Sequence, residues 1–189
     1  MLKSLIKDTI INKLTNKNPQ PKTEEGKIAN LSYISNENQR EVEAKKLGYE
    51  LDRGLSNSDH TVLKKDGKVK VVFKGTSKAK DLLADINIVR GNQENDPTFK
   101  EALEKTKKVQ AKYGNDIEVS GHSLGGSKAI HVGEKLKLKS TALNPGITPF
   151  RGKKNYGSNI NIKSISGDIV SGNPNIFKNV IDTHGLENF

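Results

Sequence analysis

The sequence predicts an α/β fold in which a mainly parallel sheet is flanked by helices, with an amphipathic helix at the N-terminus. Three observations favour this class. Short apolar segments with the alternating pattern of strands recur along the chain. Segments with the 3.6-residue pattern of helices separate them. Glycine, asparagine, proline or aspartate follows the predicted strands, as is typical of turns at strand ends.

The composition fits one globular domain with a small core and excludes several kinds of site. The chain has 189 residues, of which 32% are hydrophobic and 5% aromatic. It contains no cysteine, so disulfides, thiolate nucleophiles and cysteine metal sites are excluded. The four histidines are scattered and no dense carboxylate loop occurs, so neither a metal nor a cofactor is expected.

The net charge of +10 raises the question of an anionic partner. The basic residues are mostly lysine, and the few aromatic residues are not interleaved with them. Because nucleic-acid interfaces favour the arginine fork and aromatic stacking, nucleic acid is not expected as a partner. A positive surface would also attract anionic lipid head groups.

Residues 1–17 predict a basic amphipathic helix, and the polar, proline-containing stretch 16–26 predicts a linker. The expected organisation is therefore a helix plus linker over residues 1–26 and one α/β domain over residues 27–189. The apolar stripe of the helix either packs on the domain or a partner subunit, or anchors the protein to an anionic membrane surface. Neither a signal peptide nor a membrane-spanning run is evident, which predicts a cytoplasmic or virion-associated protein rather than a secreted one.

Two helices and a hairpin are predicted in the first part of this domain. Apolar residues recur at helical spacing over residues 27–48, with a break near residues 36–38. Strands are predicted over residues 55–64 and 68–73, because apolar residues alternate there and Lys65-Asp66-Gly67 between them is a hairpin signal. One face of the second strand carries Val69, Val71 and Phe73.

The best-marked helix begins after Asp96, with Pro97 as its first residue, and ends at Gly114. Two short strands are predicted later, over residues 140–143 and 160–165. In a mainly parallel sheet, functional groups collect beyond the C-terminal ends of the strands. The predicted buried stripe of the helix is Phe99, Ala102, Leu103, Thr106, Val109 and Tyr113.

The stretch from Asp116 to Gly133 joins a strand to a helix through a tight corner. Gly121-His122-Ser123-Leu124-Gly125 fits the G-x-S-x-G pattern, in which a nucleophilic serine stands at the C-terminal edge of a sheet. The helix N-terminus and the N–H of Leu124 would stabilise an oxyanion there. The pattern therefore predicts acyl transfer by Ser123. A phosphate loop is the alternative, but Lys128 is one place away from the lysine position of that motif.

A nucleophilic serine needs a base and an acid that orients the base, which hydrolases of this kind supply in the chain order serine, acid, histidine. Asp168 and His184 satisfy that order. The other three histidines fall in an early strand, inside the corner and on the helix after it. Asp182 is the alternative acid, and an ordinary turn aspartate and surface histidine are the alternative interpretations of Asp168 and His184.

Residues 55–189 resemble the class 3 lipases in several motifs that occur in the family's order. The motifs are Val71-Val72-Phe73-Lys74-Gly75-Thr76, Asp81-Leu82-Leu83-Ala84-Asp85, Gly121-His122-Ser123-Leu124-Gly125-Gly126, Asn144-Pro145-Gly146 and Ser166-Gly167-Asp168-Ile169-Val170. The resemblance implies a small α/β-hydrolase with a triad of Ser123, Asp168 and His184. It also implies an oxyanion hole made by the backbone of Thr76 and Leu124.

By the same resemblance, the protein is expected to be a serine hydrolase that cleaves carboxylic esters of lipids through an acyl-enzyme. The segment 77–85 carries few apolar residues and no long lid, so a phospholipase or general esterase is favoured over an interface-activated lipase. Its partners would be a lipid or small ester substrate and an anionic membrane surface. The alternative is a catalytically inactive hydrolase-like scaffold with a structural or membrane-binding role.

Overall fold

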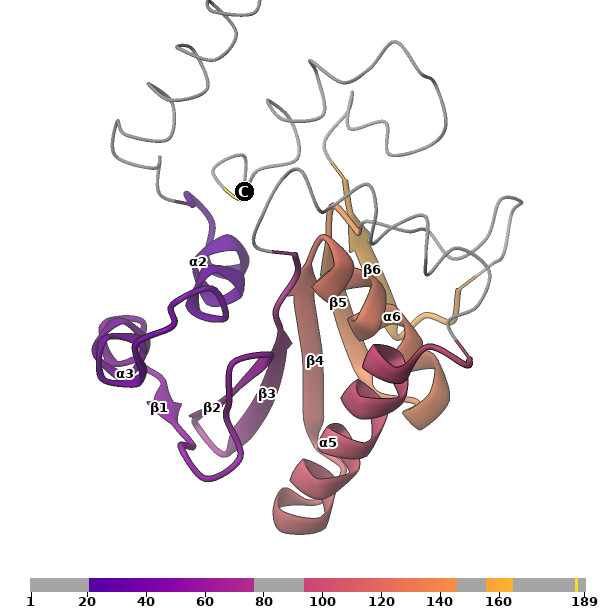
Figure 1. Ribbon diagram of the computed structural model, residues 1–189, viewed down its shortest axis with the longest axis horizontal. Helices are drawn as coiled ribbons and strands as arrows, with labels where there is room; N and C mark the ends of the chain where they lie inside the picture. The colour runs from indigo at the N-terminus through magenta and orange to yellow at the C-terminus, as the bar shows by residue number, and fades with distance from the viewer. Residues whose placement is uncertain (1–20, 77–93, 146–155, 165–185, 187–189) are drawn as a thin grey trace, which may run out of the picture.

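The computed structural model describes residues 21–76, 94–145, 156–164 and 186 of the chain. Within these ranges, four helices flank a six-stranded sheet with the order β1-β2-β3-β4-β5-β6 (Figure 1). The strands are β1 (Glu50–Leu51), β2 (His60–Lys65), β3 (Lys68–Phe73), β4 (Ile117–His122), β5 (Lys139–Leu143) and β6 (Ile160–Lys163). The helices are α2 (Glu24–Leu31), α3 (Glu37–Lys46), α5 (Pro97–Tyr113) and α6 (Leu124–Leu136). The helix predicted over residues 1–17 lies outside the described residues.

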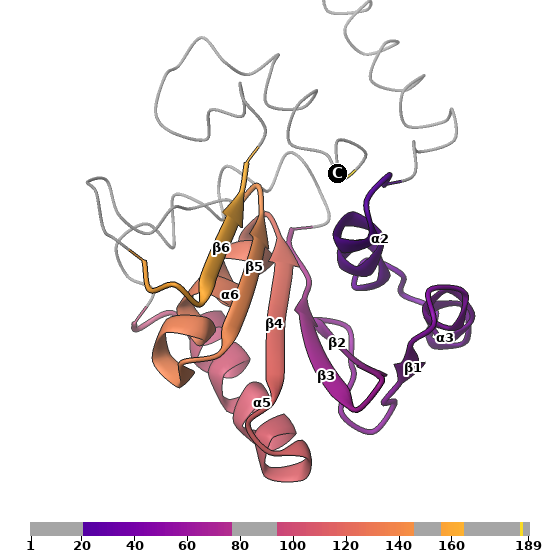
Figure 2. The same cartoon turned by 180° about the vertical axis from the view of Figure 1, so that it is seen from behind.

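The sheet is antiparallel at its start and parallel from β3 to β6. β1 pairs with β2 and β2 with β3 in antiparallel register, whereas β3–β4, β4–β5 and β5–β6 are parallel pairs. Each parallel strand therefore ends at the same edge of the sheet, which is the upper edge in Figures 1 and 2. The predicted α/β class with a mainly parallel sheet is confirmed.

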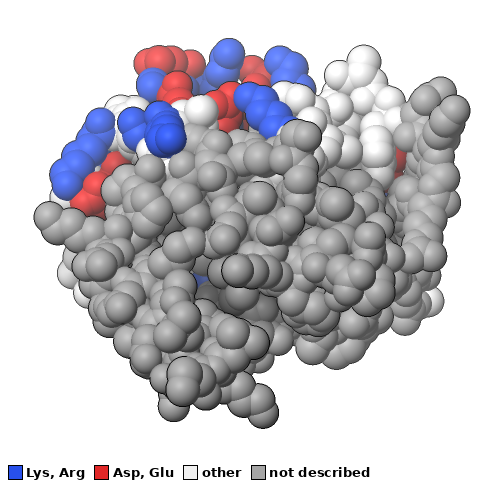
Figure 3. Space-filling model, turned by 90° about the horizontal axis from the view of Figure 1, so that it is seen from above, with Lys and Arg blue, Asp and Glu red and all other residues white. Residues whose placement is uncertain are grey.

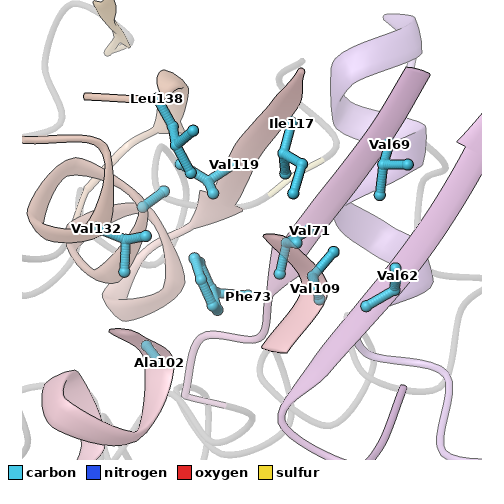
Figure 4. Packing of buried hydrophobic residues seen from close by; sticks show 11 residues of the cluster. Val62, Val69, Val71, Phe73, Ala102, Val109, Ile117, Val119, Val132 and Leu138 are labelled. Carbon is cyan, nitrogen blue, oxygen red and sulfur yellow. The ribbon is translucent and has the colours of Figure 1, made fainter. Parts of the chain in front are cut away.

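One hydrophobic core lies between the sheet and the helix pair α5–α6 (Figure 4). Val71 and Phe73 of β3 project into it, as predicted from the alternation of that strand, and Val119 of β4 joins them. The helices contribute Ala102 and Val109 from α5 and other residues from α6. Among the described residues, the buried members are Val62, Val69, Val71, Phe73, Ala102, Val109, Ile117, Val119, Ala129, Val132 and Leu138.

A second, smaller core lies on the other face of the sheet, under α2 and α3. Leu63 and Val72, whose neighbours in the chain face the first core, point to this side because successive residues of a strand alternate. The buried members are Ile28, Leu31, Ala44, Leu51, Leu63 and Val72. The two helix pairs thus cover opposite faces, with α5–α6 in front of the sheet in Figure 1 and behind it in Figure 2.

Local signals in the sequence fix several element ends as predicted. Asp96 caps α5 by accepting hydrogen bonds from the backbone N–H groups of Thr98 and Phe99, and Pro97 occupies the first turn. Gly114 ends that helix with a φ of 80°. The β2–β3 hairpin turns through Asp66 and Gly67, both with positive φ, which is the requirement of a two-residue type I′ turn.

Two predicted boundaries were wrong by several residues. The first strand of the hairpin begins at His60 rather than Leu55, because side chains hold the preceding loop in turns: Asp52 accepts from Leu55 N–H, and Asn57 accepts from His60 N–H. Such side-chain bonds to the backbone compete with sheet formation. Helix α2 begins at Glu24, inside the stretch predicted to be a linker, because Thr23 caps it through a hydrogen bond from Gly26 N–H.

The break between α2 and α3 was predicted near residues 36–38 and lies just before, with Asn36 as the N-cap of α3. None of the described helices is long and apolar enough to cross a membrane.

Candidate active site

Ser123 stands at the corner between β4 and α6. β4 ends at His122 and α6 begins at Leu124, so a single residue makes the turn. Ser123 has φ 58° and ψ −128°, a conformation that costs a non-glycine residue about 1–3 kcal/mol. Although it occupies the N-cap position, where serine usually bonds to the helix backbone, its side chain makes no capping hydrogen bond. The predicted strand–turn–helix arrangement is confirmed, and the backbone strain is typical of a functional position.

Two glycines make this corner possible by close approach of backbone to backbone. A Cβ at Gly121 would lie 2.4 Å from the carbonyl carbon and oxygen of Gly125. A Cβ at Gly125 would lie 2.2 Å from the backbone oxygen of Phe73, at the end of β3. Because both neighbours are backbone atoms, a side chain at either position requires the elements to separate. The two glycines of the G-x-S-x-G pattern therefore hold α6 against β3 and β4.

The Ser123 hydroxyl is buried and has no hydrogen-bond partner among the described residues. Three other buried hydroxyls share this property, those of Thr61, Ser120 and Ser140. Ser123 alone of these four has a positive φ, so the backbone conformation distinguishes it. Its own backbone is tied down, because its N–H donates to Leu143 O at 3.0 Å and its carbonyl accepts from Ser127 N–H at 3.1 Å.

The helix N-terminus gives the site its electrostatic character. The first N–H groups of α6, beginning with that of Leu124, have no carbonyl of their own helix to bond to. Together with the helix dipole they make this end of α6 positive. Negative charge that develops beside Ser123 is therefore stabilised, which is the requirement of an oxyanion hole.

The end of β3 lies against this corner, as the parallel β3–β4 pairing requires. A Cβ at Gly75 would lie 3.1 Å from the Ser123 Cβ and 2.5 Å from the His122 backbone oxygen. Thr76, the next residue, is half-buried. The fold thus brings the predicted oxyanion residues, Thr76 and Leu124, to the same edge of the sheet as Ser123.

Tyr33, which the sequence analysis did not identify, also reaches this site. Its hydroxyl lies 3.0 Å from His122 Nδ1, and the two rings meet edge to face with centroids 6.1 Å apart. Burial raises the pKa of Tyr33, against the opposing effect of the Gly75 backbone N–H. The phenol is therefore protonated at neutral pH. Since Tyr33 and His122 are 89 residues apart, no local pattern in the sequence could have paired them.

The predicted triad acid and base, Asp168 and His184, and the alternative acid Asp182, lie outside the described residues. Leu186 is described, and it packs with Ala29 of α2 and Leu143 of β5. Leu143 is the residue whose carbonyl accepts the Ser123 N–H. Leu186, which follows His184 by two residues, thus packs beside the Ser123 corner.

Two other histidines belong to the scaffold, as predicted. His60 begins β2, where its Nε2 lies 2.7 Å from Leu55 O, and His131 lies on α6 with its ring edge to face with Phe99. Burial lowers the pKa of both side chains. Among the described residues, no group of three or more histidines and carboxylates is arranged to hold a metal ion.

Figure 3 shows the molecule from above, the side on which the parallel strands end. In the described part of this face, Lys and Arg lie next to Asp and Glu. The same mixing occurs near the site, where Lys163 at the end of β6 pairs with Glu25 of α2 at 2.7 Å.

Comparison with known proteins gives one family match. Residues 76–164 match the model of an uncharacterised protein family (UPF0227). The matched range starts at Thr76, contains the Ser123 corner and ends next to β6. None of the curated proteins compared with the chain matches it. The match does not identify the class 3 lipases in particular, so the chain is similar, over residues 76–164, to this uncharacterised family.

Proposed function

We propose that the protein is a serine hydrolase that cleaves carboxylic esters of lipids or small alcohols through an acyl-enzyme. The observation that carries the proposal is the conformation of Ser123: a strained residue between a parallel strand and a helix N-terminus, with a hydroxyl that caps nothing. A structural serine at a helix start would be expected to cap the helix instead. The match to the uncharacterised family UPF0227 is compatible with a hydrolase.

In the proposed reaction, Ser123 Oγ attacks the ester carbonyl carbon and its proton passes to His184. The carbonyl oxygen becomes an oxyanion, which the backbone N–H groups of Thr76 and Leu124 stabilise together with the dipole of α6. His184 returns the proton to the leaving alcohol, and Asp168 holds the imidazole in the required tautomer. Water then attacks the acyl-enzyme by the same route and releases the carboxylic acid.

Leu186 supports the assignment of His184 as the base. Its contacts with Ala29 and Leu143 anchor the C-terminal chain beside the corner that carries Ser123. Two residues of chain span at most about 7 Å, so an anchor at Leu186 is compatible with a histidine that reaches Ser123. We favour a phospholipid or simple ester as the substrate. The basic residues 1–17 would bind an anionic membrane surface, from which the substrate would reach the site.

The test is hydrolysis of short p-nitrophenyl esters and of phospholipid vesicles by the full chain and by single variants. Ser123→Ala and His184→Ala are each expected to lower kcat by at least about 10⁴-fold with the fold intact, since either change removes the nucleophile or its base. Asp168→Ala is expected to cost less, because the acid acts through the base. If Asp182→Ala is the more damaging of the two acid variants, the acid is Asp182. If wild-type protein is folded but hydrolyses no ester, the catalytically inactive scaffold replaces this proposal.

A further inference from the structure

The hydroxyl of Tyr33 lies at the meeting point of two chain segments that the proposed function needs to hold together. One segment is the end of β3, where a Cβ at Gly75 would lie 2.5 Å from the Tyr33 oxygen. The other is the end of β4, where His122 Nδ1 is 3.0 Å from the same oxygen. Tyr33 itself comes from neither strand but from the connection between α2 and α3 on the other face of the sheet.

These two segments are the ones that would carry the halves of the oxyanion hole. Thr76 directly follows Gly75, and Leu124 follows His122 by two residues. The parallel ladder fixes the strands only as far as the pairing of Phe73 with Gly121. Beyond that pair, β3 has ended and the chain leaves the sheet. The spacing between the two N–H groups therefore depends on contacts other than the ladder.

The chemistry of the phenol suits this bridge. A protonated hydroxyl has one proton to donate and lone pairs to accept with. It donates to His122 Nδ1 in the tautomer that carries the ring proton on Nε2, and its oxygen faces the Gly75 backbone N–H, which acts on the pKa of Tyr33. One oxygen atom thereby connects both segments. A phenylalanine would fill the same space and connect neither.

We propose that Tyr33 is a positioning residue for the oxyanion hole: its hydroxyl holds the end of β3 against the end of β4 so that the N–H groups of Thr76 and Leu124 converge on one oxygen. This inference rests on the proposed hydrolase function. It assigns a role in positioning the oxyanion hole to a residue outside the G-x-S-x-G corner. The α2–α3 connection would then support the site as well as cover the sheet.

The test is Tyr33→Phe in the full chain, compared with wild type and with Tyr49→Phe. Tyr49 is a matched control, since its hydroxyl bonds to Glu24 at 3.4 Å on the surface, away from the Ser123 corner. Loss of an oxyanion donor costs on the order of 10²–10³-fold in kcat, and a displaced donor costs less, so Tyr33→Phe is expected to lower kcat about 10- to 100-fold. KM should stay within about twofold, because the hole acts mainly in the transition state.

A second readout separates positioning from a general loss of structure. A boronic acid forms a tetrahedral adduct with the active serine, so its affinity reports the hole directly, and it should fall in Tyr33→Phe by a factor similar to the fall in kcat. Tyr49→Phe should change neither quantity. Combining Tyr33→Phe with His122→Ala should cost less than the product of the two single effects if the hydroxyl acts through His122.

The outcomes separate this inference from the function on which it rests. If the wild type is active and Tyr33→Phe has the same kcat and boronate affinity, the inference is wrong and the proposed hydrolase function stands. The inference would also be wrong if Tyr33→Phe raised KM and lowered boronate affinity by the same factor while kcat stayed unchanged. That result would mean that Tyr33 contributes to binding of the ground state. A folded wild-type protein with neither esterase activity nor boronate binding would overturn both proposals.

Discussion

Replacing Gly125 by alanine tests the close contact that fixes Ser123 to the sheet. The added Cβ would lie 2.2 Å from Phe73 O and 2.9 Å from the carbonyl carbons of Phe73 and Lys74. Phe73 cannot move aside easily, because it pairs with His60 on one side and with Gly121 on the other. The N-terminus of α6 must therefore shift away from β3.

The size of the effect follows from the contact. A carbon–oxygen contact is normally about 3.3 Å or more, so α6 and β3 must separate by about 1 Å. Overpacking of this kind costs about 1–3 kcal/mol, while alanine in place of glycine in a helix recovers up to about 1 kcal/mol, which leaves a net loss of up to about 2 kcal/mol in the free energy of unfolding. A displacement of 1 Å in the catalytic groups can lower kcat/KM by about 10²-fold.

The assay pairs urea unfolding with ester hydrolysis, and Gly133→Ala is the control. Gly133 lies on the same helix, where a Cβ would approach Ser140 Cβ at 2.7 Å and Ile160 Cδ1 at 2.8 Å, well away from Ser123. Gly133→Ala should lower stability but leave kcat/KM of the folded protein unchanged. Wild-type stability and kcat/KM in Gly125→Ala would refute the claim that this contact fixes the site.

Two further predictions concern the scaffold. Because burial lowers the pKa of His60 in the folded protein, the unfolded chain binds a proton first, and the free energy of unfolding should fall as the pH drops below about 6.5. His60→Gln should reduce the slope of stability between pH 7 and 5.5 in urea titrations, and an unchanged slope would contradict the assignment. Burial raises the pKa of Asp52, but hydrogen bonds from Lys112, Tyr113 and the Leu55 N–H outweigh this effect, so the pKa is lowered overall. Asp52→Ala should cost about 3 kcal/mol by urea unfolding while kcat/KM stays at the wild-type value; a loss below 1 kcal/mol would show that these bonds contribute little.

Elements whose determinants lie close together in sequence could be predicted with good boundaries. Asp96, Pro97 and Gly114 act on the residues next to them, and α5 begins and ends where they indicate. The same holds for the turn at Asp66 and Gly67. The corner at Ser123 belongs to this class as well, because the change from strand to helix period and the flanking glycines all fall within a few residues.

Features that depend on distant residues could not be predicted in this way. The apolar alternation before His60 suggested an earlier start of β2, but Asp52 and Asn57 hold that loop with side-chain bonds. The bond between Tyr33 and His122 joins residues 89 positions apart, so it follows from the tertiary fold alone. The acid and base of the triad remain predictions, and the packing of Leu186 bears only on the base, His184.

The central claim is that Ser123 is an activated nucleophile, and covalent labelling by a fluorophosphonate probe tests it most directly. The probe reacts with an activated serine whatever the natural substrate is. Wild-type protein, Ser123→Ala and heat-denatured wild type should be compared, with folding of the first two checked by urea unfolding. We predict labelling of the wild type alone. Equal labelling of Ser123→Ala, or no labelling of folded wild type, would contradict the claim.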